Sequence, residues 1–494
     1  MSGTFFGFNT ALKSLFAQQK AMNTTSHNIA NASTPGYTRQ QAVMAADFAF
    51  PVPSMNRPGG AGQVGTGVNV VEMRRIRDQF LDKQIRQELA SLGYWEQMAE
   101  TLKLAETTFI EPSDSGLSTL FNEFWVTWQE LSKNAENVAI RTSLVETSVS
   151  LAEALNHAHS QLTTIVNDLK YVADIKADQV NTIAQQIDDL NKQIATIQLA
   201  GDAPNDLKDK RDLLLDELAK LVDFEIEETT VERPVGYKKD EDGNTEVVIG
   251  KVPDGQIKIY LGKGKNPDNL LVDVNQTDVQ GNSINVRQID FIDGVPPTFG
   301  WADGNDMDIN NGQLVGIIAA ISHVEDYITD LDNLAISLAR SINELHRTGT
   351  DLYDENKGIN FFAFRPGQFG ASGIYVNDVI VDDINLIAAS FGDDGSGDHN
   401  GSIALQISQL RPAIDRQYDQ LVSRIGVKTN EAARRTDGQD VLIGQLEGRK
   451  ESMSGVSLDE EMAMMLQFQR IYQASATMIT TLDEMIQTIL AMKR

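Results

Sequence analysis

The sequence contains no cysteine among its 494 residues. Without thiols, the chain can form no disulfide, no cysteine-ligated zinc site and no thiol nucleophile. Long apolar runs are also missing, because patches such as 314–321 fall well short of the roughly 18 consecutive apolar residues that a membrane span needs. The sequence therefore excludes three kinds of site chemistry and predicts no membrane-spanning helix.

Basic residues are scarce: 42 Lys and Arg stand against 70 Asp and Glu, for a formal net charge of −28. A chain of this charge is not attracted to phosphate backbones or to anionic lipid. We therefore expect neither nucleic acid nor a membrane among its partners. The first basic residue is Lys13, and residues 2–32 mix polar with apolar side chains, so we expect no Sec-type signal peptide.

Signatures of catalysis and metal binding are missing as well. No two histidines have the H-E-x-x-H spacing, and neither G-x-S-x-G nor a P-loop occurs. Residues 60–65 fit G-x-G-x-x-G, but prolines precede them and a strand-like run follows, which favours a flexible turn. Residues 240–246 and 306–312 resemble calcium loops without glycine at the sixth place, so solvated turns are favoured and calcium binding stays open. We expect no enzyme activity, no catalytic or metal-ligating residue and no cofactor.

Both ends of the chain carry apolar residues at heptad spacing. They predict one helix from about residue 5 to residue 29, and another of about 35 residues that starts after Ser457 in a capping box with Glu460. Neither narrow stripe can be buried by its own helix, so we expect the two helices to pair as a coiled coil and to contact other copies of the chain. For either end taken alone, the alternative is that its helix belongs to the core of a globular domain. The N-terminal seam is Phe8, Leu15, Met22 and Ile29, and the C-terminal seam is Leu458, Met465, Phe468, Tyr472, Ile479, Leu482, Ile486 and Ile489.

Long helices are predicted for much of the middle of the chain. Residues 138–200 contain no proline or glycine and carry an apolar seam, which predicts one long helix. Residues 206–222, 317–345 and 403–446 predict three more, the last of them divided or kinked at Pro412.

Between residues 224 and 308 the apolar period changes to two. This period predicts strands, and turn sequences such as Asp254-Gly255 between them predict hairpins. The insertion is therefore expected to be a compact antiparallel β domain. The predicted strands are Phe224 to Val231, Glu246 to Ile249, Gln256 to Leu261, Leu270 to Val274 and Ile284 to Phe291.

The predicted fold class is mainly α with an inserted β domain: an elongated multidomain rod in which the N- and C-terminal helices pair as a coiled coil. We expect a terminal helical coiled-coil domain, a long-helix rod domain and an inserted antiparallel β domain. The coiled-coil domain comprises residues 1–55 and 455–494, the rod domain comprises residues 56–222 and 309–454, and the β domain comprises residues 223–308. The rod domain includes an irregular or β excursion at 351–401.

The segment after the first helix, SHNIANASTPGYTRQ at residues 26–40, carries the most specific pattern. Its asparagines can bond free backbone groups at a helix end, and its Pro-Gly pair turns the chain outward. The segment resembles the NNxANxxTxGYxRQ motif that follows the first helix of flagellar rod, hook and hook-associated proteins. The residues of this candidate assembly motif are Asn28, Ala30, Asn31, Thr34, Pro35, Gly36 and Tyr37.

Other segments narrow the resemblance to the FlgK family of hook-associated proteins. The resemblance covers the helical parts of the chain, whereas the β insertion and residues 351–401 match only loosely. The similar segments are GTGV at 65–68 before RRIRD at 74–78, PSDSGL at 112–117, DLKDKRD at 206–212, GQL at 312–314 and SGVSLDEE at 454–461.

The resemblance implies a structural subunit of the bacterial flagellar axis that joins hook to filament. It also implies export by the flagellar type III apparatus, and so an extracellular location without a cleaved signal peptide. The implied partners are other copies of the chain, the hook protein, a second hook-associated junction protein and a cytoplasmic export chaperone at the C-terminal helix. Two alternatives stay open: another axial protein of the hook or rod, and an extracellular enzyme or adhesin module on a flagellar scaffold.

Overall fold

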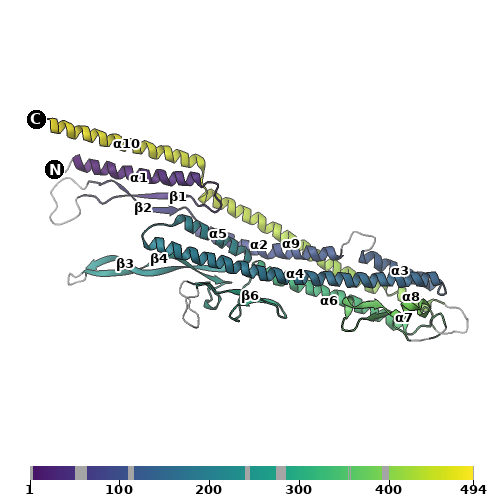
Figure 1. Cartoon of the computed structure of the whole chain (residues 1–494). Coiled ribbons are helices and arrows are strands. Elements are labelled where there is room, and N and C mark those ends of the chain that lie inside the picture. The colour runs from purple at the N-terminus through teal and green to yellow at the C-terminus, as the bar shows by residue number, and fades with distance from the viewer. Residues whose placement is uncertain are drawn as a thin grey trace.

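The chain folds into an elongated, mainly α-helical rod with both chain ends at one tip (Figure 1). The computed structural model describes residues 4–50, 64–109, 116–239, 245–273, 285–353, 355, 358–391 and 400–492. Within these ranges, no helix is long and apolar enough to cross a membrane. The predicted fold class is confirmed, including the pairing of the terminal helices.

The terminal helices α1 (Thr4–Ala30) and α10 (Leu458–Ala491) lie antiparallel at the tip of the rod (Figure 1). Ser14 Oγ lies 2.9 Å from Ser475 Oγ, and Asn28 donates a hydrogen bond to Glu461 nearer the rod. Towards the chain ends, Gly7 lies against Leu482. Steps of seven residues along α1 therefore match steps of seven along α10, as in a coiled coil that keeps its register.

A two-stranded antiparallel sheet packs against α1. Its strands are β1 (Gln40–Ala46) and β2 (Val68–Arg75). The strand-like run after residue 67 predicted part of β2, but β1 was not predicted. Neither strand has a fully buried face, so apolar side chains are not required at every second position. The sequence of β1 therefore shows no clear apolar alternation by which a strand could be predicted.

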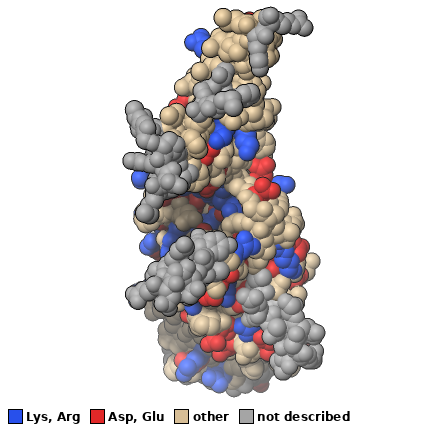
Figure 2. Space-filling model, turned by 90° about the vertical axis from the view of Figure 1, so that its left-hand side faces the viewer, with Lys and Arg blue, Asp and Glu red and all other residues tan. Residues whose placement is uncertain are grey.

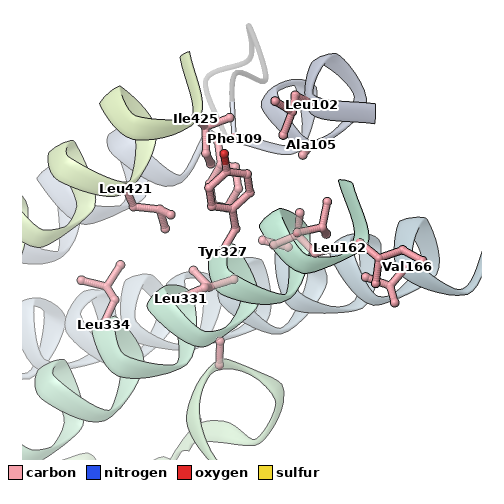
Figure 3. Close-up of a cluster of buried hydrophobic side chains, with 14 of the residues drawn as sticks. Leu102, Ala105, Phe109, Leu162, Val166, Tyr327, Leu331, Leu334, Leu421 and Ile425 are labelled. Atoms are coloured by element: carbon pink, nitrogen blue, oxygen red, sulfur yellow. The ribbon is translucent and has the colours of Figure 1, made fainter. Parts of the chain in front are cut away.

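Long helices packed side by side form the rod. The predicted helices at 138–200, 206–222 and 317–345 are confirmed, whereas two further helices between residues 79 and 133 were not predicted. Tyr327 and Leu331 of α6 meet Leu162 of α4, Leu102 of α2 and Leu421 of α9 in one core (Figure 3). The helices are α2 (Gln79–Phe109), α3 (Leu117–Lys133), α4 (Val138–Leu199), α5 (Asn205–Leu221), α6 (Gln313–His346), α8 (Ser402–Ser408) and α9 (Arg411–Ser454).

The predicted helix at 403–446 is divided near Pro412, as expected, into α8 and α9. However, α9 continues past the predicted end and reaches the terminal pair at Ser454. Gly444 and Gly448 lie near the predicted end, and glycine weakens an isolated helix. In the structure both glycines face open space. Helix α9 stays continuous through them and packs along α2.

The β insertion packs against α4. It forms two antiparallel sheets whose strands overlap all five predicted ones, but the hairpin turn predicted at Asp254-Gly255 is wrong. Strand β4 runs through Asp254-Gly255, where Gly255 has a φ of 84° beside a shift in strand register, so this pair is a bulge and not a hairpin turn. The strand predicted at 284–291 is present as β6 from Ile289, residue 284 itself lies outside the described residues, and β7 was not predicted. The first sheet holds β3 (Phe224–Lys239), β4 (Thr245–Leu261) and β5 (Leu270–Val272), and the second holds β6 (Ile289–Ile292) and β7 (Thr298–Trp301).

The irregular excursion between α6 and α8 contains a short hairpin and a short helix. These elements are β8 (Phe362–Phe364), β9 (Ile374–Val376) and α7 (Asp378–Asp382). Several sequence predictions lie outside the described residues: most of the glycine run at 60–65, the segment 112–115, most of the calcium-loop candidate 240–246, and residues 392–399 of the excursion at 351–401.

Candidate assembly site

The candidate assembly motif forms a turn that is bonded back onto the end of α1. The buried amide of Asn28 organises it. Its Oδ1 accepts hydrogen bonds from the Tyr37 hydroxyl at 2.7 Å and the Gln40 N–H at 3.0 Å. Its Nδ2 donates to the Gln40 carbonyl at 2.9 Å and to Glu461 Oε2 at 3.1 Å. The amide therefore uses its full bonding capacity and fixes the chain direction after the helix.

Some of the remaining motif residues are bonded within the turn and some are exposed, and Thr34 is both. Asn31 Nδ2 donates to the His27 carbonyl at 3.0 Å, and Thr34 Oγ1 donates to Asn31 Oδ1 at 3.2 Å. Gly36 has a φ of 75°, a conformation that favours glycine. The exposed members of the motif are Ala30, Thr34, Pro35 and Gly36. The inner asparagines and the tyrosine thus build the turn, whereas the exposed residues present its outer surface.

Arg39 connects this turn to the start of α10. Its Nε lies 2.7 Å from Glu461 Oε1, and Nη1 lies 3.0 Å from Glu460 Oε2. Glu461 is fully buried, and Asn28 bonds its other oxygen. The predicted capping box is wrong, because the Ser457 side chain makes no cap bond and Glu460 pairs with Arg39 instead. Sequence reasoning did not predict that Arg39 pairs with Glu461, because the two residues lie 422 positions apart in the chain.

A network of buried charges continues from the turn into the rod. The Thr38 N–H donates to Asp209 of α5 at 3.0 Å. Arg75, Arg77 and Arg86 all pair with Asp212, at 2.7, 3.3 and 3.3 Å. Burial alone would raise the pKa of Asp212, but the three guanidinium groups outweigh burial and lower this pKa to about 2. Asp212 is therefore held as a carboxylate that joins β2, α2 and α5.

The predicted N-terminal seam lies beside the buried face of α1, not at its centre. Phe8, Leu15, Met22 and Ile29 are only partly buried. The contacts with α10 come one residue earlier in each heptad, at Gly7, Ser14 and Asn28. The same four-and-three spacing includes the buried residues Ala11, Gln18, Ala21 and Thr25. These side chains are small or polar, so a search for large apolar residues passes over them.

On α10 most of the predicted seam residues are partly buried. Leu458 and Ile489 are exceptions, because they are 50% and 57% exposed. The buried positions of this helix are polar, Glu461 and Ser475. The seam residues on the partly buried face are Met465, Phe468, Tyr472, Ile479, Leu482 and Ile486. A second apolar stripe, which we call the outer stripe, is exposed at Ile471, Met478 and Met485. The pair thus leaves apolar surface accessible after its helices have met.

The candidate assembly site is built from hydrogen bonds and ion pairs that join the chain ends to the rod. No group of three or more acidic or histidine side chains in the described part of the chain could hold a metal ion. The buried histidine of α6, His346, uses both ring nitrogens, with Nδ1 2.8 Å from the Ile359 carbonyl and Nε2 2.9 Å from the Ala388 N–H. These bonds give His346 a structural role.

Three family models match the chain. Residues 102–362, more than half of the sequence, match the helical domain of flagellar hook-associated protein FlgK. Residues 8–38 match the flagella basal body rod protein model. Residues 451–492 match the C-terminal model of the flagellar basal body rod FlgEFG proteins. The last two matches cover the candidate assembly motif and the C-terminal helix.

Relatives match over nearly the whole length. Flagellar hook-associated protein 1 of Bacillus subtilis (strain 168) is 32% identical, with 99% of this chain and 98% of the relative covered. The protein of the same name in Escherichia coli (strain K12) is 26% identical, with 98% of each chain covered. The solved structure of the flagellar hook junction protein FlgK from Burkholderia pseudomallei has a TM-score of 0.45 and 19% identity, and covers 57% of this chain and 47% of that chain. The family-model match and the full-length relatives establish that this chain belongs to the FlgK family of flagellar hook-associated proteins.

Proposed function

We propose that this chain is a structural subunit of the flagellar axis that joins hook to filament by self-assembly through its terminal helices. The observation that carries the proposal is the accessible apolar surface on the α1–α10 pair. The outer stripe residues Ile471, Met478 and Met485 are 36%, 58% and 50% exposed. Covering apolar side chains releases about 25 cal/mol per Å² of buried surface, so this face favours contact with neighbouring subunits.

In this proposal the candidate assembly motif sets the angle between the terminal pair and the rod. The Asn28–Glu461 bond joins the end of α1 to the start of α10, and the Thr38–Asp209 bond joins the turn to α5. Subunits that stack through their terminal helices need this angle to be the same in every copy. The exposed Pro35 and Gly36 are then available to a neighbouring subunit.

The proposed partners are other copies of this chain, the hook protein and a second hook-associated junction protein. The subunit acts outside the cell after type III export without a cleaved signal peptide. A cytoplasmic chaperone holds α10 before export. Exposed methionines support this last step, because flexible thioether side chains suit a helix that must fit more than one partner. They are Met462, Met478, Met485 and Met492.

The function needs no catalysis, and we propose that the subunit is not an enzyme. Membership of a family of structural flagellar proteins supports this view over an enzyme or adhesin module in the β insertion. The helical-domain match at 102–362 likewise favours a hook-associated protein over a hook or rod protein.

Replacing the outer stripe by aspartate tests the proposal. Ile471, Met478 and Met485 are exposed and lie outside the predicted seam towards α1, so Asp at these positions should leave the subunit folded. In a strain that lacks the gene, this triple variant should be exported but should leave hooks without filaments, seen by electron microscopy.

The matched control carries Asp at exposed polar positions of the same heptads, Gln473, Thr480 and Gln487. It should restore filaments and swimming. Normal filaments on the outer-stripe variant, or their equal loss in the control, would contradict assembly through this face.

A further inference from the structure

A cavity of about 950 Å³ lies where β2, α2 and α5 meet the base of the β3–β4 hairpin. Figure 2 shows a recessed part of this side of the molecule in which basic and acidic side chains gather. Although the whole chain carries a formal charge of −28, basic side chains outnumber acidic ones along the cavity wall. The cavity is therefore locally richer in positive charge than the rest of the surface.

Most buried cations around the cavity are already paired. Arg75 pairs with Asp209 and Asp212, and Arg77 pairs with Asp82. Lys208 and Arg211 differ from them. Both line the cavity, yet neither forms an ion pair with a carboxylate among the residues that the structure describes. Since they are three residues apart on α5, they lie on the same side of that helix.

Arg211 also has a donor without an acceptor. Its side chain is only 7% exposed, and Nη1 donates to Asn191 Oδ1 at 2.8 Å and to the Gly255 carbonyl at 2.7 Å. Its Nε has no hydrogen-bond acceptor among the described atoms. A buried unpaired donor lowers stability, more so when it carries charge. An acceptor at this position would remove that penalty.

The cationic forms of both residues are destabilised. Burial lowers the pKa of Arg211 to about 10, and repulsion from Arg75 adds to the effect, which Asp212 partly opposes. Burial likewise lowers the pKa of Lys208, and Arg75 and Arg211 lower it further, whereas Glu228 and Asp212 partly oppose the effect. Each group would be stabilised by a negative charge placed between them.

We propose that this cavity is an oxyanion-binding site in which Lys208 and Arg211 hold a carboxylate or a phosphate-type anion. Ammonium and guanidinium groups form charge-assisted hydrogen bonds to both kinds of oxyanion. The anion is either a free small ion or the carboxylate of an acidic side chain from a second copy of this chain. Only the second source rests on the self-assembly proposed above.

Calorimetric titration of the full chain with inorganic phosphate, at constant ionic strength set by chloride, tests the site. We expect saturable binding that Lys208→Ala weakens about ten-fold, since one charge-assisted contact is lost. Lys210→Ala is the matched control, because Lys210 is exposed on the same helix and does not line the cavity. Arg211→Lys keeps the charge but removes Nε, and should also weaken binding.

Glutarate, a free dicarboxylate, serves as the second probe and is titrated in the same way. Absence of saturable binding of both probes to the wild-type chain would overturn the proposal, as would equal affinity in the Lys208→Ala and Lys210→Ala variants. Because the probes need no second copy, either result is distinct from a failure of self-assembly.

Sedimentation velocity distinguishes the two possible sources of the anion. If a second copy supplies the carboxylate, Lys208→Glu should lower self-association, phosphate should compete with it, and Lys210→Glu should leave it unchanged. If self-association is the same in the two variants while phosphate binds, the anion is a free ion. Both outcomes support an oxyanion site and differ only in its source.

Discussion

A carboxylate can be fully buried in the candidate assembly site because each of its oxygens has a partner. Glu461 Oε1 faces Arg39 Nε at 2.7 Å, and Oε2 accepts from Asn28 at 3.1 Å. Removing one partner of such a pair leaves an uncompensated buried charge, which costs several kcal/mol. The pair defines which residue of α10 lies against the end of α1.

We predict that Arg39→Ala destabilises the contact between α1 and α10 by about 3 kcal/mol, because Glu461 keeps its charge and loses its cation. Hydrogen exchange of the α1 amides measures this loss. Adding Glu461→Gln to the Arg39→Ala variant should recover part of it. Glu460→Gln is the control and should change stability by less than about 1 kcal/mol, because the Glu460 side chain is 65% exposed. A double variant no more stable than Arg39→Ala would contradict this account.

His346 predicts a pH dependence of stability. Burial lowers its pKa from the ordinary 6.5 to about 4, and Arg141 nearby adds to the effect. Between these values the unfolded chain binds a proton that the folded chain does not, so the free energy of unfolding falls as pH drops from 6.5 to 4. The full loss is about 3 kcal/mol, since one pKa unit corresponds to about 1.4 kcal/mol.

Urea unfolding at pH 7 and pH 4.5 measures this dependence. The wild-type chain should lose more stability between the two pH values than His346→Asn, which has no imidazole to protonate, even if the variant is less stable throughout. Equal losses would show that the ring is not protonated on unfolding.

At the scale of single residues, sequence reasoning predicted the local half of the site. Asparagine near a helix end and Pro-Gly after it predicted a turn, which the structure contains. The partners of Asn28 did not follow from the sequence, because Glu461 is 433 residues away. Sequence distance likewise hides the three arginines around Asp212, since they come from β2, from α2 and from the link between them.

Among the elements, the heptad pattern predicted α4 and α6 well because large apolar residues occupy their buried faces. It misplaced the centre of the α1–α10 contact by one residue. There the face is built from Gly7, Ala11 and Ser14, which carry little apolar signal. Small side chains let two helices approach closely, so the large neighbours remain partly accessible for other contacts.

We predict that Ser14→Leu separates the terminal helices. A leucine would have to fit where the two serine oxygens are 2.9 Å apart, and overpacking of this kind costs about 1–3 kcal/mol. Limited proteolysis should then cleave α1 faster than in the wild-type chain. Gln19→Leu is the control, because Gln19 is exposed on the same helix. Equal cleavage rates in the two variants would show that the contact tolerates a larger side chain.

At the scale of the whole molecule, the β insertion has two parts with different surroundings. Near its base it is bonded to α4, where Asn191 donates to the Ile257 carbonyl and Asn181 donates to the Ile289 carbonyl. Farther out, β3 and β4 project beyond the end of α4 (Figure 1). The composition of the insertion predicted strands, but not that one sheet would cover a rod helix, because that depends on packing between distant segments.

We predict that shortening the projecting part of the hairpin leaves the rod stable. Thr230 and Pro253 are opposite each other in the sheet, so an Asn-Gly turn joining them replaces residues 231–252 without uncovering the bonds to α4. Thermal unfolding should change by no more than about 2 °C, whereas removal of 224–308 should lower the midpoint strongly. A large loss in the shortened chain would show that the projecting part supports the rod.

The antiparallel arrangement of the chain ends means that the tip of the molecule is attached to the rod by two covalent links, at residues 76–78 and 455–457. The backbone of Arg39 bridges them, since its N–H donates to the Ser454 carbonyl at 3.0 Å and its carbonyl accepts from Ile76 at 2.8 Å. A torque applied to the tip is therefore shared between two coupled tethers. Two linked segments therefore transmit rotation of the tip to the rod, whereas a single segment would let the tip rotate freely.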